Sequence, residues 1–277
     1  MIDKITSIYR EKGAPEVFLK ILGKAGLDWR MQTLMTKHRR HLSREVMKIF
    51  NNTVASGPFK GMKLPICSAW GQEDQAVRVL GIYEREVQNE VVKLTRQFKT
   101  STFIDLGGAD GYYAIGVLVN DLYPHSIVYE TTVNGRETIA RAARLNYCAD
   151  RVTIKGTAKP GFLSELKAEG LDLNNCLFLF DIEGEEFDLL TTEVLEHLSN
   201  SVLIVEVHDF TATQKKAAQK LEQQAAHHFN VRTITTGSRN PGKFKELANL
   251  TDHDRWLLMS EGRGKLMYWL VLTPKFA

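Results

Sequence analysis

The feature that most constrains the fold is an alternation of short apolar runs with helix-like segments, which starts at residue 101. The runs FIDL, LFLFDI and VLIVEV are nearly continuous in apolar residues, as expected of strands buried on both faces. Such alternation predicts an α/β fold with a mostly parallel sheet and helices on both faces. The predicted strands cover residues 102–106, 126–130, 151–155, 176–181, 201–208, 231–235 and 266–272. The predicted helices between the earlier strands cover residues 112–120, 135–146, 185–198 and 212–228.

The N-terminal third of the chain has a different pattern. Segments 16–27, 42–51 and 83–98 have apolar residues at helical spacing, and residues 56–70 form a stretch rich in Gly and Pro that predicts a loop. We therefore predict a helical N-terminal region over residues 1–95 and an α/β domain over residues 96–277. The N-terminal region is expected to act as a substrate lid or as a contact between copies in a homo-oligomer.

Charge is distributed unevenly along the chain. The net charge is +3, but residues 1–45 contain ten Lys or Arg and five Asp or Glu, so the remainder is slightly acidic. A basic N-terminal region favours a phosphorylated or acidic substrate or a membrane surface, and solvated faces of surface helices explain it as well. The basic stretch KHRRHLSR at residues 37–44 is the feature that an RNA-binding protein would use. No aromatic residues alternate with it, so a nucleic-acid partner is not favoured.

Cysteine usage and hydropathy indicate the compartment. The three cysteines are far apart and form no CxxC pair, so neither a zinc site nor a disulfide framework is expected. The N-terminus lacks the apolar core of a signal peptide, and no stretch approaches the roughly 18 apolar residues that span a membrane. The sequence predicts a soluble, cytoplasmic protein without a transmembrane segment.

A glycine-rich turn follows the first predicted strand and precedes a helix, in the segment FIDLGGADG. In an α/β fold this turn is where a ligand approaches the backbone, and Gly107 and Gly111 permit that approach. A dinucleotide site would have the pattern GxGxxG, but Ala109 and Tyr112 occupy the second and third glycine positions. A nicotinamide-dependent oxidoreductase is therefore disfavoured.

Acidic residues beside this turn favour S-adenosylmethionine as the cofactor. Asp105 precedes the glycines and suits the cationic methionine end, which it would contact directly or through water. Glu130 ends the second strand 25 residues later, where a carboxylate accepts hydrogen bonds from ribose hydroxyls. Caps at a turn and at a strand end are the structural alternative for these two residues. The predicted cofactor-binding residues are Asp105, Gly107, Gly108, Asp110, Gly111, Glu130 and Asp181.

The candidate catalytic residues are Asp181 and His208, which end the fourth and fifth strands. Both belong to the edge of the sheet where ligands bind, and a histidine there is a candidate general base. Asp181 would orient the acceptor or the cofactor. A structural role for His208 stays open, and Glu185 and Glu186 are assigned to the first turn of the next helix.

A divalent metal such as Mg²⁺ is a second way to activate an acceptor hydroxyl, because it lowers the pKa of that hydroxyl. The donors would come from Asp181, Glu183, His208 and Asp209. No spacing in the sequence requires a metal, so none is assigned.

Several motifs resemble the FkbM-type family of class I methyltransferases. They are YEREV at 83–87, FIDLGGADGYYAIG at 103–116, the strand end at Glu130, FDIEGEE at 180–186, VEVHDF at 205–210 and, more loosely, the C-terminal DRW, EGR and YWLVLTP. The resemblance implies a Rossmann-like fold with seven strands, the last one antiparallel. It also implies O-methylation of a sugar, a glycan or another secondary metabolite. The family more often has GANxG where this chain has GGADG.

Two other functions stay open beside an O-methyltransferase. One is an N-methyltransferase that acts on a macromolecule such as RNA. The other is a catalytically inactive, cofactor-binding interaction module. Salt dependence of binding would identify the first, and detection of any methylated product would exclude the second.

Overall fold

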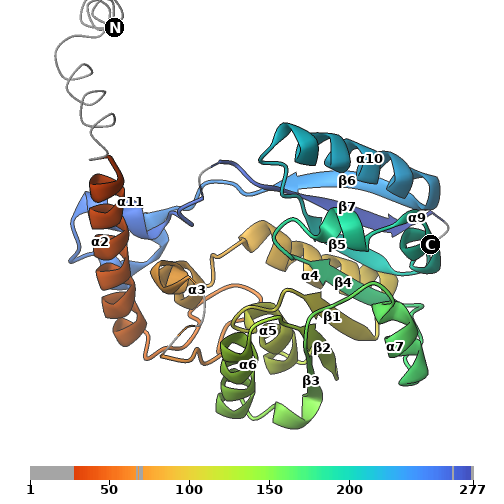
Figure 1. The fold of residues 1–277 in the computed structure, drawn as a ribbon. Helices are drawn as coiled ribbons and strands as arrows, with labels where there is room; N and C mark the ends of the chain where they lie inside the picture. Colours follow the sequence, from red (N-terminus) through yellow and green to blue (C-terminus); the bar gives the residue numbers. More distant parts are fainter. Residues whose placement is uncertain (1–27, 67, 69–70, 264, 276–277) are drawn as a thin grey trace, which may run out of the picture.

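The computed structural model describes residues 28–275 except 67, 69–70 and 264, together with the side chains from residue 34 onward. The predicted helix at 16–27 lies outside the described residues. A seven-stranded sheet with helices on both faces forms the centre of the described part (Figure 1). Its strands are β1 Thr102–Leu106, β2 Ser126–Tyr129, β3 Val152–Lys155, β4 Cys176–Phe180, β5 Val202–Glu206, β6 Phe229–Thr235 and β7 Tyr268–Pro274.

The strand order is β3-β2-β1-β4-β5-β7-β6. Neighbours from β3 to β5 are parallel, whereas β7 runs antiparallel to both β5 and β6. This confirms the predicted α/β fold, its mostly parallel sheet and its antiparallel last strand. The chain order reverses direction between β1 and β4, and ligands of open α/β sheets bind at such a switch point, outside the carboxyl ends of the strands.

Alternate residues of the central strands point into two separate hydrophobic cores. In β4, Leu177 and Leu179 belong to one core, and Phe178 and Phe180 belong to the other. All four are at most 2% exposed, which explains why the sequence of this strand shows no polar–apolar alternation. Helices α4, α5 and α6 contribute to the first core and α7, α9 and α10 to the second.

The helices predicted at 83–98, 112–120, 135–146 and 212–228 begin and end close to those positions, whereas the helix predicted at 42–51 begins at residue 28, and three short helices were not predicted. The helices of the described part are α2 Asp28–Ile49, α3 Gln75–Leu80, α4 Arg85–Phe98, α5 Tyr112–Val119, α6 Val133–Leu145, α7 Phe162–Ala168, α8 Glu186–Leu189, α9 Thr192–His197, α10 Ala212–His228 and α11 Asp252–Leu258. The single helix predicted at 185–198 is wrong, because two helices occupy this segment. Leu190 leaves the helical conformation at ψ 63°, and the Thr191 side chain caps the new helix by accepting a hydrogen bond from the Val194 N–H.

The described part of the N-terminal region is helical, as predicted, and it packs on the α/β domain. Helix α4 runs through the predicted boundary at residues 95–96, and its Val87, Val91 and Leu94 lie in the same core as α5. Helix α2 contacts α3 and α11, so segments from both ends of the chain lie side by side (Figure 1). Within residues 28–275, as far as the structure describes them, no helix has the length and hydrophobicity to cross a membrane.

Candidate functional site

A cavity of about 850 Å³ opens at the carboxyl ends of β1, β2, β4 and β5. Its wall includes Gly107, Glu130, Asp181 and Glu206, which end these strands or directly follow them. This volume is typical of pockets that bind a small molecule or a cofactor. The cavity therefore lies at the carboxyl edge of the sheet, where ligands of open α/β sheets bind.

The glycines of the turn after β1 serve close packing. At Gly107, with φ at 95°, a methyl group would overlap the carbonyl oxygen of Asp181, so only glycine allows β1 and β4 to end side by side. At Gly108 the same group would overlap the Val128 side chain. Gly111, with φ at 80°, precedes the first residue of α5. Of these three residues, Gly107 lies on the cavity wall.

Two of the predicted cofactor-binding acids lie behind the cavity wall. Asp105 is 3% exposed, and burial raises its pKa to about 7, although a hydrogen bond with the Ala114 backbone acts in the opposite direction. Asp110 pairs with Arg78 at 2.8 Å and also accepts a hydrogen bond from Ser68. Neither acid lines the large cavity. A contact of Asp105 with a ligand there would run through water, which is one of the two forms that the sequence predicted.

Glu130 stands on the wall with its carboxylate held by backbone groups. One oxygen accepts a hydrogen bond of 2.9 Å from the Ala109 N–H, and the other accepts bonds of 2.7 Å from the N–H and the hydroxyl of Thr132. These bonds fix the carboxylate between the glycine turn and the start of α6. Ala109, which has a φ of 47°, also lies on the wall and was not predicted as a site residue.

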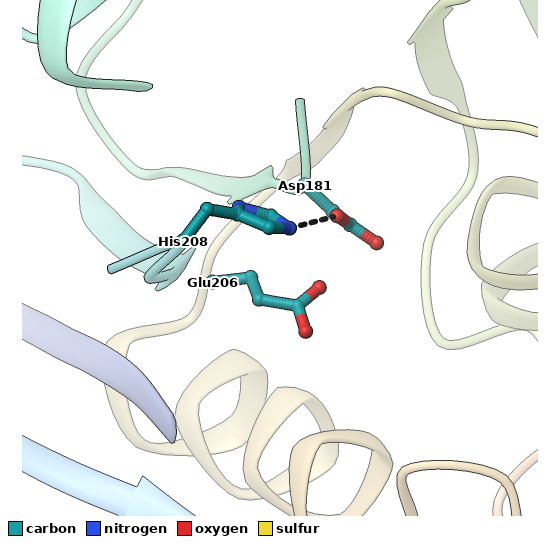
Figure 2. A group of neighbouring side chains, drawn as sticks. All are labelled: Asp181, Glu206 and His208. Atoms are coloured by element: carbon teal, nitrogen blue, oxygen red, sulfur yellow. Dashed lines mark ion pairs between the residues drawn. The ribbon is translucent and has the colours of Figure 1, made fainter. Parts of the chain in front are cut away.

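His208 lies just beyond the end of β5 and is held by a buried carboxylate. The Oε1 atom of Glu186 lies 3.2 Å from Nδ1 of His208 and 2.9 Å from its backbone nitrogen. The other ring nitrogen, Nε2, lies 3.8 Å from the Asp181 carboxylate (Figure 2). The Glu183 carboxylate lies 3.6 Å from the same atom. Burial lowers the pKa of His208, but the hydrogen bond to Glu186 and the nearby negative charges outweigh it, so the pKa lies above its ordinary value.

Glu186 lies in the first turn of α8, as predicted. Its side chain is 0% exposed, and the second carboxylate oxygen accepts a hydrogen bond of 2.8 Å from the Gly184 N–H. A buried carboxylate with these partners orients the His208 ring. Its position 22 residues away in sequence gave no signal for this contact.

Asp181, Glu206 and His208 form a mixed donor set at the ends of β4 and β5 (Figure 2). One oxygen or nitrogen atom from each lies within 4.8 Å of the other two. Burial and the neighbouring Glu206 charge raise the pKa of Asp181 well above its ordinary value. Carboxylate and imidazole donors at this spacing suit a divalent ion. The set differs from the predicted one, because Glu206 replaces Glu183 and Asp209, and Asp209 pairs with Lys265.

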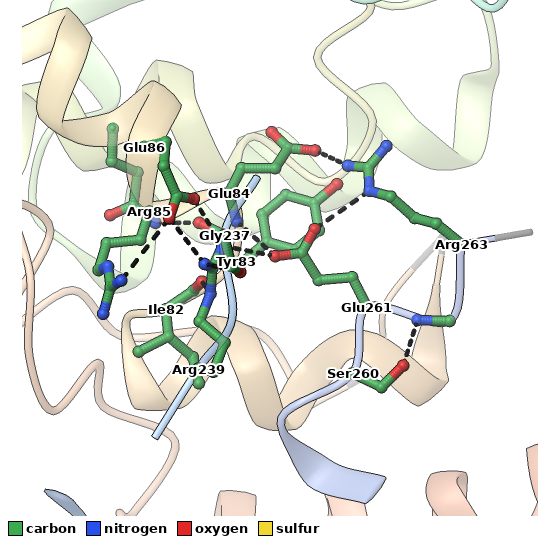
Figure 3. A network of polar contacts seen from close by, with 12 residues as sticks. Ile82, Tyr83, Glu84, Arg85, Glu86, Gly237, Arg239, Ser260, Glu261 and Arg263 are labelled. Atoms are coloured by element: carbon green, nitrogen blue, oxygen red, sulfur yellow. Dashed lines mark hydrogen bonds and ion pairs between the residues drawn. The ribbon is translucent and has the colours of Figure 1, made fainter. Parts of the chain in front are cut away.

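A network of charged side chains that includes Glu84, Arg239, Glu261 and Arg263 lies beside the site (Figure 3). Each of the three side-chain nitrogens of Arg263 donates to a different carboxylate, those of Glu84, Glu206 and Glu261. Glu84 is 2% exposed and also accepts a hydrogen bond of 2.8 Å from the Tyr113 hydroxyl. Burial and the charge of Glu206 raise the pKa of Glu84 to about 7, and Arg263 opposes this rise. The sequence did not predict Arg263 as a site residue.

The basic stretch at residues 37–44 is partly engaged in internal ion pairs. His38 lies 2.7 Å from Asp254 of α11, Arg39 pairs with Asp74, and Arg40 lies 3.3 Å from Glu73. These contacts attach α2 to the short helices before α4 and to α11. They reduce the positive charge that this stretch offers to a nucleic acid.

Comparisons with solved structures identify the fold. TomG, an O-methyltransferase from Streptomyces achromogenes solved with S-adenosylmethionine, is 14% identical over 73% of this chain and 87% of its own, with a TM-score of 0.50. An O-methyltransferase from Bacillus cereus is 13% identical over 74% and 98%, with a TM-score of 0.47. A precorrin-6y C5,15-methyltransferase from Geobacter metallireducens is 13% identical over 70% and 90%, with a TM-score of 0.44. No family model and no curated protein matches the chain. At 14% identity the likeness to TomG shows a shared fold alone, which the strand order given above supports.

Proposed function

We propose that this protein is an S-adenosylmethionine-dependent methyltransferase that methylates a hydroxyl group of a sugar, a glycan or another secondary metabolite. One observation carries the proposal: the cavity lies at the switch point of a class I methyltransferase sheet and has Gly107, Glu130 and Asp181 on its wall. The motifs that resemble the FkbM-type family occupy this wall and support the choice of acceptor.

The charges of the cavity wall suit a cationic cofactor. Among the described wall residues, seven carry carboxylates and two are arginines. A sulfonium with an adjacent ammonium is favoured in such a field, whereas a dinucleotide would place its pyrophosphate among like charges. The donor set therefore fits S-adenosylmethionine. Glu130 would hold the ribose hydroxyls, and Gly107 and Asp181 would border the methionine portion.

When bound, S-adenosylmethionine supplies an electrophilic methyl group, and the residues of this chain prepare the acceptor. Glu186 accepts the Nδ1–H of His208, so the lone pair of Nε2 faces the cavity. Nε2 is then placed to accept the proton of an acceptor hydroxyl, which has too high a pKa to react as it stands. Asp181, beside Nε2, orients the acceptor through a hydrogen bond. Phe210 and Met267 add apolar surface to the cavity wall.

A divalent ion held by Asp181, Glu206 and His208 is the alternative way to activate the hydroxyl. Arg263 pairs with Glu206 but shares its single charge with Glu84 and Glu261. Loss of turnover on chelation, restored by Mg²⁺, would favour the metal route over the His208 base.

The proposal is tested by isothermal titration of the purified protein with S-adenosylmethionine and, in parallel, with NAD. We expect saturable binding of the first ligand and none of the second. Folded protein that is free of co-purified nucleoside and still binds no S-adenosylmethionine would contradict the proposal. Saturable binding would justify a screen of sugar, glycan and polyketide acceptors by mass spectrometry, in which a mass gain of one methyl group identifies the product.

A further inference from the structure

One cation on the cavity wall takes no part in the chemistry described above. Arg78 lies in α3, is 4% exposed, and lines the large cavity together with Gly107 and Tyr83. Its Nη1 atom lies 2.8 Å from Asp110 Oδ2, and its guanidinium carbon lies 5.0 Å from the centre of the Tyr83 ring. An arginine held between a carboxylate and an aromatic face has little freedom, so its charge has a fixed position.

The charges on the cavity wall bear on which arginine would bind a ligand carboxylate. Both arginines of the described wall pair with carboxylates of the protein, Arg263 with three of them and Arg78 with Asp110, so their locations on the wall distinguish them. A ligand carboxylate in a cavity with seven carboxylate side chains needs a cation beside it to offset repulsion and desolvation. Arg78 lies at the glycine turn, where the methionine portion of the proposed cofactor would end.

We propose that Arg78 binds the α-carboxylate of S-adenosylmethionine and that Asp110 positions its guanidinium. This inference rests on the proposed function, and it assigns to Asp110 an indirect role in place of a contact with the cofactor. It also means that the N-terminal region completes the cofactor site, because Arg78 precedes β1 by 24 residues. Cofactor affinity then depends on how α3 packs against the glycine turn.

The test compares two ligands that differ only in the carboxylate. S-adenosylhomocysteine carries it, and S-adenosyl-3-thiopropylamine lacks it. We expect Arg78→Gln to weaken S-adenosylhomocysteine binding on the order of 10- to 100-fold, the range for a hydrogen bond between charged groups. Binding of the second ligand should change less than about threefold on the same basis, since it makes no bond to this side chain. Isothermal titration measures both, and a thermal melt checks folding.

Arg39→Gln is the matched control. Arg39 is a buried arginine of α2 that bonds to Asp74 and to the Glu73 carbonyl, and it does not line the cavity. We expect it to leave the affinities of both ligands unchanged. The same selective loss in Arg39→Gln would show that a general disturbance of the N-terminal packing is responsible, and would overturn the assignment.

The remaining outcomes separate this inference from the proposed function. Wild-type protein that binds neither ligand contradicts both. Wild-type protein that binds S-adenosylhomocysteine, with Arg78→Gln weakening both ligands equally or neither, overturns the inference and leaves the proposed function in place. If Arg78→Gln does not fold, the affinities of the wild-type protein for the two ligands still test the assignment. The wild-type protein should prefer the carboxylate-bearing ligand by about tenfold or more, and equal affinities would overturn the assignment.

Discussion

The carboxylate of Glu186 approaches both the ring and the backbone of His208, at 3.2 Å from Nδ1 and 2.9 Å from the amide nitrogen. One oxygen atom thus fixes the position of the residue and the orientation of its ring. A proton on Nδ1 is favoured by this contact, which leaves Nε2 as the acceptor on the cavity side. Glu186, which belongs to the connection after β4, therefore orients His208, which follows β5.

Replacement of His208 by alanine should separate binding from chemistry. We expect His208→Ala to bind S-adenosylhomocysteine as the wild type does and to lose about 10²- to 10⁴-fold in turnover, the usual contribution of a general base. The measurement is single-turnover methyl transfer to an acceptor found in the screen. His125→Ala is the control, because His125 bonds to Thr153 and does not line the cavity. Full turnover in His208→Ala would exclude it as the base.

The pH dependence should report the contact between Glu186 and His208. The pKa of His208 lies above 6.5, and a base acts in its neutral form, so turnover should rise as the pH passes through this raised value. Glu186→Gln removes the negative charge, and the rise should move to lower pH. Titration of the His208 ring by NMR measures the shift without an acceptor. An unchanged or higher pKa in Glu186→Gln would contradict the assigned cause.

Removal of Arg263 should destabilise the protein in a pH-dependent manner. Arg263→Ala leaves Glu84, Glu206 and Glu261 without their shared cation, which costs about 3–5 kcal/mol in a buried site. The folded pKa of Glu84 is already raised to about 7 from 4.5. An acid with a raised folded pKa destabilises the fold as the pH rises through this interval, because its ionised form is disfavoured there. The loss should therefore be larger at pH 8 than at about pH 5.5.

Urea denaturation at the two pH values measures this difference in the free energy of unfolding. The control is Arg232→Ala, which removes a half-exposed partner of Glu90 and should cost less than about 1 kcal/mol at either pH. An equal loss for Arg263→Ala at both pH values would argue against buried carboxylates as the origin of the effect.

Two glycines with nearly the same φ allow the cost of a left-handed backbone to be separated from the cost of a steric clash. Gly107 and Gly161 have φ values of 95° and 93°, but a methyl group at Gly161 meets no atom within 4 Å, whereas one at Gly107 overlaps the Asp181 carbonyl. Gly161→Ala should cost about 1–2 kcal/mol for the left-handed backbone alone. Gly107→Ala should cost several kcal/mol more and abolish cofactor binding, as measured by thermal denaturation and titration. Similar costs for both would contradict the close approach of β1 and β4.

The carboxylate of Glu130 should contribute to cofactor affinity. Glu130→Gln keeps the shape of the side chain but loses the charge that strengthens hydrogen bonds from ribose hydroxyls, so we expect about tenfold weaker binding of S-adenosylhomocysteine. Glu137→Gln, an exposed position on α6, is the control and should have no effect. Comparison with a 2′,3′-dideoxyribose analogue tests the contact itself. If Glu130→Gln weakens both ligands equally, Glu130 acts through the Ala109 and Thr132 backbone instead.

The amino-acid sequence by itself determined the strands, the mostly parallel character of the sheet and the residues that stand at the strand ends. Apolar runs such as 177–180 report burial on two faces directly, because a strand with no polar position cannot face water on either side. Residues that follow such runs come to one edge of a parallel sheet whatever the packing of the helices. For this reason Gly107, Glu130, Asp181 and His208 lie together on the cavity wall, and their roles in binding and catalysis stay predictions.

Only the tertiary structure decided which charges pair and which face the cavity. Glu186 belongs to a helical first turn by local pattern, and its contact with His208 depends on the packing of α8 against the end of β5. Arg263 meets Glu84 from 179 residues away, and Arg78 reaches the glycine turn from a helix that precedes the sheet. Periodicity records whether a side chain is buried, but it carries no information on its partner. Long, flexible charged side chains acquire their roles only when distant segments are packed together.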